Sequence, residues 1–222
     1  MATPAEHFAD ARNCMVDSQI RPNRVTDPRI LSAMRQLPRE RFLPPDAWPL
    51  AYVDEDVPLG NGRFMLEPMV LARLLQAASL RDNERVLVVG AGSGYGAAVL
   101  AACGCRVTAL EEDTALLAIA HAVLPAVAPG VTVVTGPLAA GWPANGPYDL
   151  ILIEGAVPAL PAALAEQIHR ESGRILAAIH TVGRTTQAVI AEATAFGIGV
   201  SPLFDCGTPP IPSLRKAPMF AF

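Results

Sequence analysis

Cysteine pairs at metal-binding spacing are missing from this sequence of 222 residues. Its 4 cysteines are scattered along the chain, and the only close pair, Cys103 and Cys105, forms a CxC rather than a CxxC. Zinc centres and the disulfide frameworks of small secreted proteins need several such pairs. We therefore expect no metal site and no disulfide scaffold, and we expect Cys103 and Cys105 to be small buried thiols.

Long apolar runs and an excess of positive charge are also missing. No apolar stretch approaches the roughly 20 residues that cross a bilayer, and residues 1–14 contain no apolar signal core. The formal net charge of -4 gives no general attraction for nucleic acid or anionic lipid. These absences predict a soluble, cytoplasmic protein without a nucleic-acid or membrane partner.

A glycine-rich turn at residues 85–100, RVLVVGAGSGYGAAVL, is the most informative feature that is present. The apolar run Val86–Val89 predicts a buried strand, and the glycines of Gly90–Gly94 permit positive φ and close approach of the backbone to a ligand. About twenty residues later a second short strand ends in Glu111 and Glu112, where α/β nucleotide-binding folds place the acid that holds a ribose. This spacing predicts a turn that cradles a nucleotide.

From residue 83 onward the sequence alternates strand and helix patterns, which predicts parallel βαβ units and a doubly wound sheet. The expected strands lie near 85–89, 106–110, 131–135, 148–153 and 173–179, and the expected helices near 94–103, 113–125 and 159–170. Two further strands, 185–194 and 197–204, are separated by a short turn, which favours an antiparallel sheet edge. The apolar residues 219–222 are expected to dock as a terminal strand.

The first 80 residues do not show the alternating strand and helix patterns of the rest of the chain. They contain charged residues, prolines and irregularly spaced apolar residues. Helical patterns cover residues 5–19, 29–35 and 68–78, and the prolines and glycines of residues 43–63 predict an extended, turn-rich passage. We expect a single domain over residues 1–222. Residues 1–80 would form an N-terminal helical cap and a substrate loop, and residues 81–222 the cofactor-binding α/β core.

Several motifs in this order resemble the protein-L-isoaspartate O-methyltransferase family. They lie in residues 15–44, in Ala51–Gly60 (AYVDEDVPLG), in the glycine turn with Ala98–Ala101, and in Gly146–Ile151 (GPYDLI) followed by Gly173–Leu176. The resemblance implies a Rossmann-like class I methyltransferase fold with a mostly parallel seven-stranded sheet and an antiparallel edge. It also implies methyl transfer from S-adenosylmethionine to the abnormal carboxylate of isoaspartyl residues, a protein repair reaction on a protein or peptide substrate.

Site residues carried over from the family fall into two groups. Glu111 would bind the ribose, the glycine turn would admit the methionine portion, and backbone N–H groups near Leu138 would contact adenine. The candidate cofactor residues are Gly90, Ala91, Gly92, Ser93, Gly94, Glu111, Glu112 and Leu138, and the candidate substrate-loop residues are Asp54, Arg63, Phe64 and Leu66. For Arg63 the sequence leaves two interpretations open, attraction of an acidic acceptor or an ordinary exposed charge.

The sequence departs from the family at positions that the family uses for cofactor binding and methyl transfer. The family loop Gly-Gln-Thr-Ile-Ser is replaced here by GRFML, so that Phe64 and Leu66 stand at the Thr and Ser positions and no catalytic residue is assigned. Val88 and Pro137 replace two acidic positions of the cofactor motifs. Two lost contacts could weaken cofactor affinity by roughly one to three orders of magnitude, and we still expect binding to survive.

The sequence is compatible with more than one function. Methylation of a carboxylate needs no general base, because the acceptor is already ionised at neutral pH, so a repair reaction is compatible with the altered loop. The same loop suits a homologue that methylates another acceptor, or a non-catalytic protein that only binds the cofactor. A nicotinamide-dependent oxidoreductase is a minor alternative, since Gly92–Ala97 formally fits G-x-G-x-x-A. The methyl acceptor and the oligomeric state are not given by the sequence.

Overall fold

A seven-stranded sheet forms the centre of the computed structural model, which describes residues 4–215. The strand order is β5-β4-β3-β6-β7-β8-β9, with the first five strands parallel and β8 and β9 antiparallel to their neighbours. The strands are β3 (Arg85–Val89), β4 (Arg106–Glu111), β5 (Thr132–Thr135), β6 (Leu150–Val157), β7 (Arg174–Ile179), β8 (Thr186–Thr194) and β9 (Gly197–Cys206). The predicted doubly wound sheet with an antiparallel edge is confirmed.

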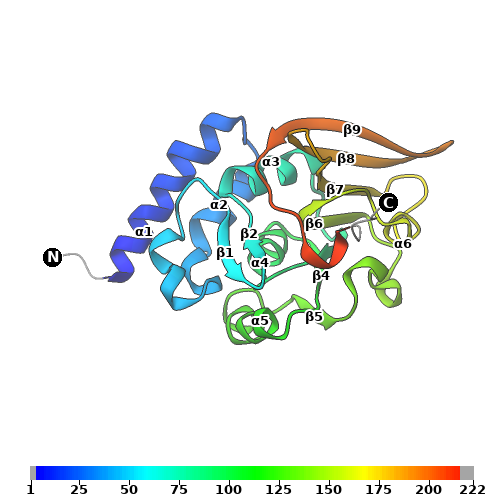
Figure 1. The fold of residues 1–222 in the computed structure, drawn as a ribbon. Coiled ribbons are helices and arrows are strands. Elements are labelled where there is room, and N and C mark those ends of the chain that lie inside the picture. The colour runs from blue at the N-terminus through cyan, green and yellow to red at the C-terminus, as the bar shows by residue number, and fades with distance from the viewer. Residues whose placement is uncertain (1–3, 216–222) are drawn as a thin grey trace, which may run out of the picture.

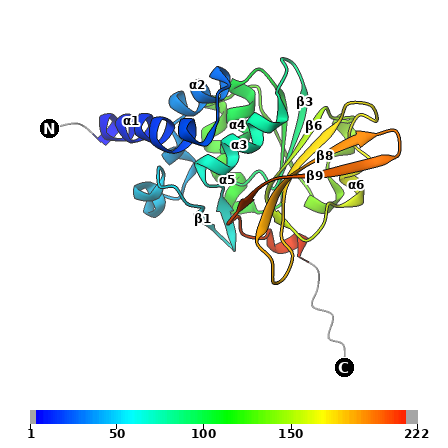
Figure 2. The same ribbon diagram turned by 90° about the horizontal axis from the view of Figure 1, so that it is seen from above.

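Helices cover both faces of this sheet. They are α1 (Pro4–Met15), α2 (Pro28–Gln36), α3 (Pro68–Ala78), α4 (Tyr95–Ala102), α5 (Thr114–Val127) and α6 (Ala162–Ala165). Figure 2 shows α1 to α4 on one side of the sheet and α6 on the other. Strands β3 and β6 are buried on both faces, since Val86–Val89 and all eight residues of Leu150–Val157 are buried. This explains why their sequences are continuous apolar runs.

The helix predicted over residues 159–170 is present but much shorter than predicted. Only Ala162–Ala165 is helical, because Pro161 precedes the helix and the chain beyond it is drawn into a bridge with the start of β6. The backbone N–H of Tyr148 donates to the carbonyl of Gln167 at 2.8 Å, and that of His169 donates to Tyr148 at 2.9 Å. The predicted terminal strand at 219–222 lies outside the described residues.

A two-stranded hairpin stands at the carboxyl ends of the parallel strands. It consists of β1 (Val57–Gly60) and β2 (Arg63–Met65), which pair antiparallel within the passage expected only to be turn-rich. Figure 1 shows it in cyan, between the N-terminal helices and the end of the sheet. β2 contacts β6, so the hairpin lies over the edge where the glycine turn is found.

Side chains of the N-terminal helices and of the α/β core pack together. One buried cluster includes Met15 and Met34 from the first 80 residues together with Val88, Leu100 and Leu152 from the sheet and α4. Among residues 4–215, no helix is long and apolar enough to cross a membrane.

Candidate functional site

The glycine turn connects β3 to α4 at the carboxyl edge of the sheet. Gly90, Gly92 and Gly94 have φ values of 68°, 57° and 97°, as their residue type predicted. The backbone N–H groups of Gly90 and Ala91 both donate to the carbonyl of Leu110 at 3.0 Å, which ties the turn to the end of β4. The turn is therefore held next to the second strand, where the acidic residues lie.

Glu111 ends β4 and is only 1% exposed. Its Oε2 accepts a hydrogen bond from the Gly92 backbone N–H at 2.7 Å, and its Oε1 accepts from the N–H groups of Glu112 at 2.9 Å and Asp113 at 3.0 Å. The structure thus brings the predicted turn and the predicted acid together. Asp113 has a local role, since its Oδ1 caps α5 by accepting from the Ala115 N–H at 2.8 Å.

The Arg63 side chain is buried against the same Glu111 carboxylate. Its Nη1 donates to Glu111 Oε1 at 2.8 Å and its Nη2 donates to the Gly90 carbonyl at 2.8 Å. The side chains of the pair are 6% and 1% exposed. The expectation of an exposed surface charge at Arg63 is wrong, because the hairpin folds its second strand over the turn and aims the guanidinium at the strand ends.

The next strand end along the sheet holds the predicted adenine side of the site. The Leu138 N–H donates to Glu112 Oε2 at 3.4 Å, and the Leu138 side chain is buried. The ring of Trp142 stands beside Gly136, with its Cζ3 3.4 Å from where a Cβ on that glycine would lie. Glu112, Leu138 and the half-buried Trp142 therefore lie together at the end of β5.

The substrate-loop residues separate into two places. Phe64 and Leu66 line, with Arg63, a small cavity of about 10 Å³ under the hairpin. The Leu66 side chain is buried, and its carbonyl accepts from Arg39 Nη2 at 2.7 Å. Asp54 is exposed on the turn before the hairpin, beside Glu67. Burial, and then the nearby carboxylate of Asp54, raise the pKa of Glu67 to about 7.

Glu154 was not predicted from the sequence, although it borders the same small cavity. It lies in β6, is 9% exposed, and its Oε1 has no hydrogen-bond partner. Burial raises the pKa of Glu154 to about 8, against the opposing effect of the Arg63 and Arg39 cations. A Cβ on Gly96 would overlap Glu154 Oε1, so the first turn of α4 packs directly on this carboxyl. The sequence signal was a single acid within the apolar run LILIEGAV.

Side-chain ends cover the glycine turn. Arg63 Nη2 and Ile211 Cδ1 lie 3.0 and 3.2 Å from where a Cβ on Gly90 would be, and Leu59 Cδ1 lies 3.1 Å from that position on Gly92. Ile211 is held there because its N–H donates to the Ala156 carbonyl at 2.9 Å, at the end of β6. Leu124 of α5 covers Gly94 in the same way, with its Cδ1 2.8 Å from the Cβ position, so the covering atoms belong to the hairpin, to α5 and to the segment after β9.

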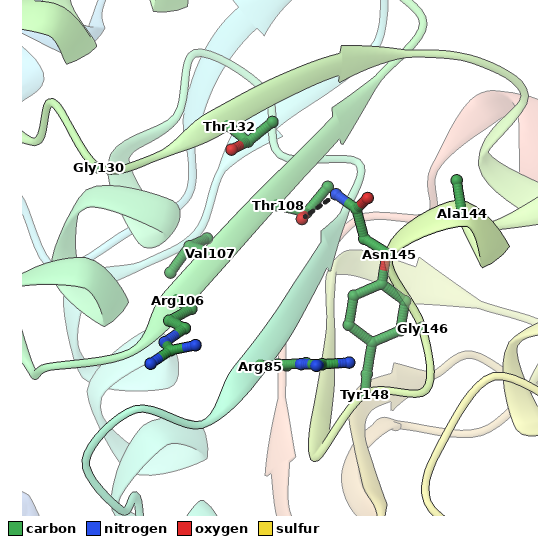
Figure 3. A pocket seen from close by; sticks show the side chains of 10 residues that line it. All are labelled: Arg85, Arg106, Val107, Thr108, Gly130, Thr132, Ala144, Asn145, Gly146 and Tyr148. Atoms are coloured by element: carbon green, nitrogen blue, oxygen red, sulfur yellow. Dashed lines mark hydrogen bonds between the residues drawn. The ribbon is translucent and has the colours of Figure 1, made fainter.

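A larger pocket of about 400 Å³ lies at the opposite edge of the sheet, at the amino ends of β3, β4 and β5 (Figure 3). It is lined by Arg85, Arg106, Val107, Thr108, Gly130, Thr132, Ala144, Asn145, Gly146 and Tyr148. Across it, Asn145 Nδ2 donates to Thr108 Oγ1 at 3.2 Å. The length of the strands separates this pocket from the glycine turn. Within residues 4–215, no group of three or more His, Cys, Asp or Glu side chains is placed to hold a metal ion.

Comparison with solved structures identifies the fold. The chain superposes on a protein-L-isoaspartate O-methyltransferase with a TM-score of 0.77 and 21% identity, covering 93% of this chain and 67% of that one. A Plasmodium falciparum structure, titled as a protein of the same kind in complex with S-adenosyl-L-homocysteine, gives a TM-score of 0.78 and 18% identity, covering 91% and 98%. Both show a class I methyltransferase fold.

Sequence comparison identifies the family. Residues 10–195 match the family model described as Protein-L-isoaspartate(D-aspartate) O-methyltransferase. A Rhodopseudomonas palustris protein named Protein-L-isoaspartate O-methyltransferase 1 is 44% identical over 165 residues, covering 74% of this chain and 67% of its own length. A Methanoregula boonei protein named Protein-L-isoaspartate O-methyltransferase is 38% identical over 191 residues, covering 86% of each chain. The chain therefore belongs to the protein-L-isoaspartate(D-aspartate) O-methyltransferase family, whose cofactor is S-adenosylmethionine.

Proposed function

We propose that this chain is an S-adenosylmethionine-dependent methyltransferase that methylates a carboxylate on a protein or peptide, as isoaspartyl repair requires. The observation that carries the proposal is the Glu111 carboxylate, fixed on the glycine turn by the Gly92 N–H at 2.7 Å. An acid at the end of the second strand beside such a turn is the ribose site of α/β nucleotide-binding folds. Family membership supports the methyltransferase reaction over the nicotinamide alternative.

The residues present fit the cofactor once the covering side chains move. Glu111 would accept from the ribose hydroxyls, the backbone of Gly90–Gly94 would lie along the methionine portion, and Leu138 and Glu112 would face the adenine. The atoms now over the turn are side-chain ends of Arg63, Leu59, Leu124, Leu138 and Ile211, not backbone atoms, and side chains of this kind change rotamer without moving the backbone. When bound, the cofactor supplies a methyl group on a positively charged sulfur.

The chain's remaining task in the reaction is to orient the acceptor and exclude water. A carboxylate acceptor is deprotonated at neutral pH, so no residue has to remove a proton from it. Phe64 and Leu66 form an apolar wall of the small cavity that Glu154 borders, and apolar groups keep water from the reacting atoms. Arg39 fixes this wall, because its Nη2 holds the Leu66 carbonyl and its Nε holds the Ala51 carbonyl at 2.8 Å.

A second candidate function is a homologue that binds the cofactor but methylates another acceptor, or that serves as a non-catalytic binding protein. One observation favours it. The side chains at the family's hydroxyl positions, Phe64 and Leu66, can neither donate nor accept a hydrogen bond to an isoaspartyl group.

Methyl transfer to a defined peptide separates the two candidates. Full-length protein is incubated with methyl-labelled S-adenosylmethionine and an isoaspartyl peptide, beside the same peptide with normal aspartate. Label in the isoaspartyl peptide alone is the expected result, and Glu111→Ala should abolish it. Label in neither peptide would exclude repair and leave the second candidate. The pair Leu66→Ser and Phe64→Thr should then restore activity if the loop alone had diverged.

We also propose a domain organisation, a class of partner and a cellular location for this protein. A single domain over residues 1–222 is supported by the buried cluster that joins Met15 to the sheet residue Val88. A protein or peptide partner, rather than nucleic acid, is supported by the net charge of -4. We propose a cytoplasmic location for the same repair role, and fractionation of cells expressing the full chain would test it.

A further inference from the structure

We propose that Arg63 is a displaceable internal ligand of the cofactor acid: it occupies Glu111 in this structure and transfers to Glu154 when the cofactor binds. The inference builds on the cofactor site proposed above, because it concerns what must leave Glu111 before a ribose can bind there. It assigns binding roles to two residues, Arg63 and Glu154, that lie at positions where the hairpin meets the sheet.

The first step is that the Glu111 carboxylate already accepts as many hydrogen bonds as it can hold. Its Oε1 accepts from Arg63 Nη1 and from the backbone N–H groups of Glu112 and Asp113 at 2.8 to 3.0 Å, and its Oε2 accepts from the Gly92 N–H at 2.7 Å. A carboxylate has about four lone-pair sites on its two oxygens, so these four donors leave no site for a ribose hydroxyl. The three backbone donors are fixed by the glycine turn and by the turn after β4. Arg63 is therefore the donor that has to leave.

The second step is that the hairpin can release the arginine. The hairpin strands have only 4 and 3 residues, and a two-stranded hairpin has little stability of its own. Besides Arg63, its tip is held by one side-chain hydrogen bond, from Asn61 Nδ2 to Asp113 Oδ2 at 2.8 Å. Arg63 itself is a long side chain whose contacts are at its far end, so rotation about its own bonds can move the guanidinium.

The third step is that Glu154 is placed to receive the guanidinium. Both side chains line the same cavity of about 10 Å³, and Glu154 Oε1 is buried without a hydrogen-bond partner. The charged groups around Glu154 are Arg63 from the hairpin, Arg39 from the Arg39–Phe42 turn, and Glu111 from β4. Arg39 is held by the carbonyls of Ala51 and Leu66 and by the Tyr95 ring, 4.8 Å from its guanidinium carbon. Arg39 therefore stays in place, and Arg63, whose two hydrogen bonds are both made by the end of its side chain, is the cation that can transfer.

After the transfer the arginine keeps an anionic partner, and the Glu111 carboxylate keeps the backbone N–H donors of Gly92, Glu112 and Asp113. In the present structure Arg63 neutralises Glu111, and the raised pKa of Glu154 keeps that carboxyl protonated near neutral pH. After transfer, Glu111 would accept from the ribose hydroxyls, and Glu154 would release its proton to solvent and pair with the guanidinium. Burying an unpaired arginine would instead oppose cofactor binding strongly.

Calorimetry of S-adenosylhomocysteine binding to the full chain tests the inference. Arg63→Gln should bind about tenfold more tightly than the natural sequence, because the competing donor is gone. Glu154→Gln should bind about tenfold more weakly, because the displaced arginine then has no anionic receiver. The double variant should match Arg63→Gln. Arg21→Gln, which removes an exposed ion pair with Asp17 outside the hairpin and the glycine turn, is the matched control and should change affinity less than about twofold.

Unchanged or weaker binding by Arg63→Gln would overturn the inference while leaving the proposed function standing. Equal weakening by Glu154→Gln in the presence and absence of Arg63 would overturn the transfer, because Glu154 would then act without the arginine. If no protein, including the natural one, bound at millimolar ligand, the proposed function would fail as well. Should Arg63→Gln not fold, Arg63→Lys keeps the charge, loses the forked contact, and should bind about threefold more tightly.

Discussion

Removing either partner of the Arg63–Glu111 pair should destabilise the protein to very different extents. In a chain that also carries Glu154→Gln, so that the arginine has no second anionic partner, Glu111→Gln leaves a guanidinium that is 6% exposed with only the Gly90 carbonyl as a fixed acceptor. Removing one partner of a buried pair and stranding the other charge costs about 3–5 kcal/mol. We expect the free energy of unfolding to fall by that amount.

Arg63→Gln should cost less, because Glu111 keeps partners. Its two oxygens would still accept from the backbone N–H groups of Gly92, Glu112 and Asp113. Only one charge-assisted contact is lost, so the expected cost is about 1–2 kcal/mol. The asymmetry follows from the position of the acid on the glycine turn, because the chain there supplies three backbone donors to the carboxylate but a single backbone acceptor, the Gly90 carbonyl, to the arginine.

Urea unfolding measures this difference. Far-ultraviolet circular dichroism and tryptophan fluorescence should give coincident transitions, with equal slopes for all variants, before free energies are compared. Arg21→Gln removes an exposed ion pair with Asp17 and is the matched control, for which we expect an unchanged midpoint. A cost for Arg63→Gln equal to or above that for Glu111→Gln would refute the reasoning.

Other parts of the structure give three further predictions. Because the pKa of Glu154 is raised from 4.5 to about 8, the native state holds a proton that the unfolded state releases, so stability should fall from pH 5 to pH 8, and Glu154→Gln should flatten that slope in pH-dependent melting. Glu84→Gln strands the buried Arg174, which it holds at 2.8 Å, and should cost about 3–5 kcal/mol in urea unfolding. Gly96→Ala should destabilise strongly, and Glu154→Ala in the same chain should recover part of that loss, because the two side chains compete for one space.

The strands were predictable because their apolar runs are continuous and short. Val86–Val89 and Val107–Leu110 are buried on both sides, and such runs have a length and composition that fit a covered parallel strand. The helix predicted over residues 159–170 is too long because the apolar spacing of this segment is helical, whereas the chain beyond Ala165 makes tertiary hydrogen bonds. Gln167 Nε2 donates to the Ala140 carbonyl at 2.8 Å, a contact that local periodicity does not contain.

The candidate site was predictable where it depends on local geometry. The glycine turn and Glu111 follow from one strand–turn–helix unit and the next strand, so their spacing along the chain fixes their proximity. Arg63 lies 48 residues from Glu111 and reaches it only because the hairpin folds back over the sheet. The residues around Arg63 show no periodic pattern of apolar side chains, so the sequence did not predict that the Arg63 side chain is buried.

A crystal structure of the full chain with S-adenosylhomocysteine would show directly whether Arg63 leaves Glu111 when the cofactor site is filled. We expect the ribose hydroxyls on Glu111, the homocysteine portion along Gly90–Gly94, and the Arg63 guanidinium moved from Glu111 to Glu154. A ligand bound while Arg63 remains on Glu111, or bound instead in the pocket beside Arg85 and Arg106, would contradict this expectation.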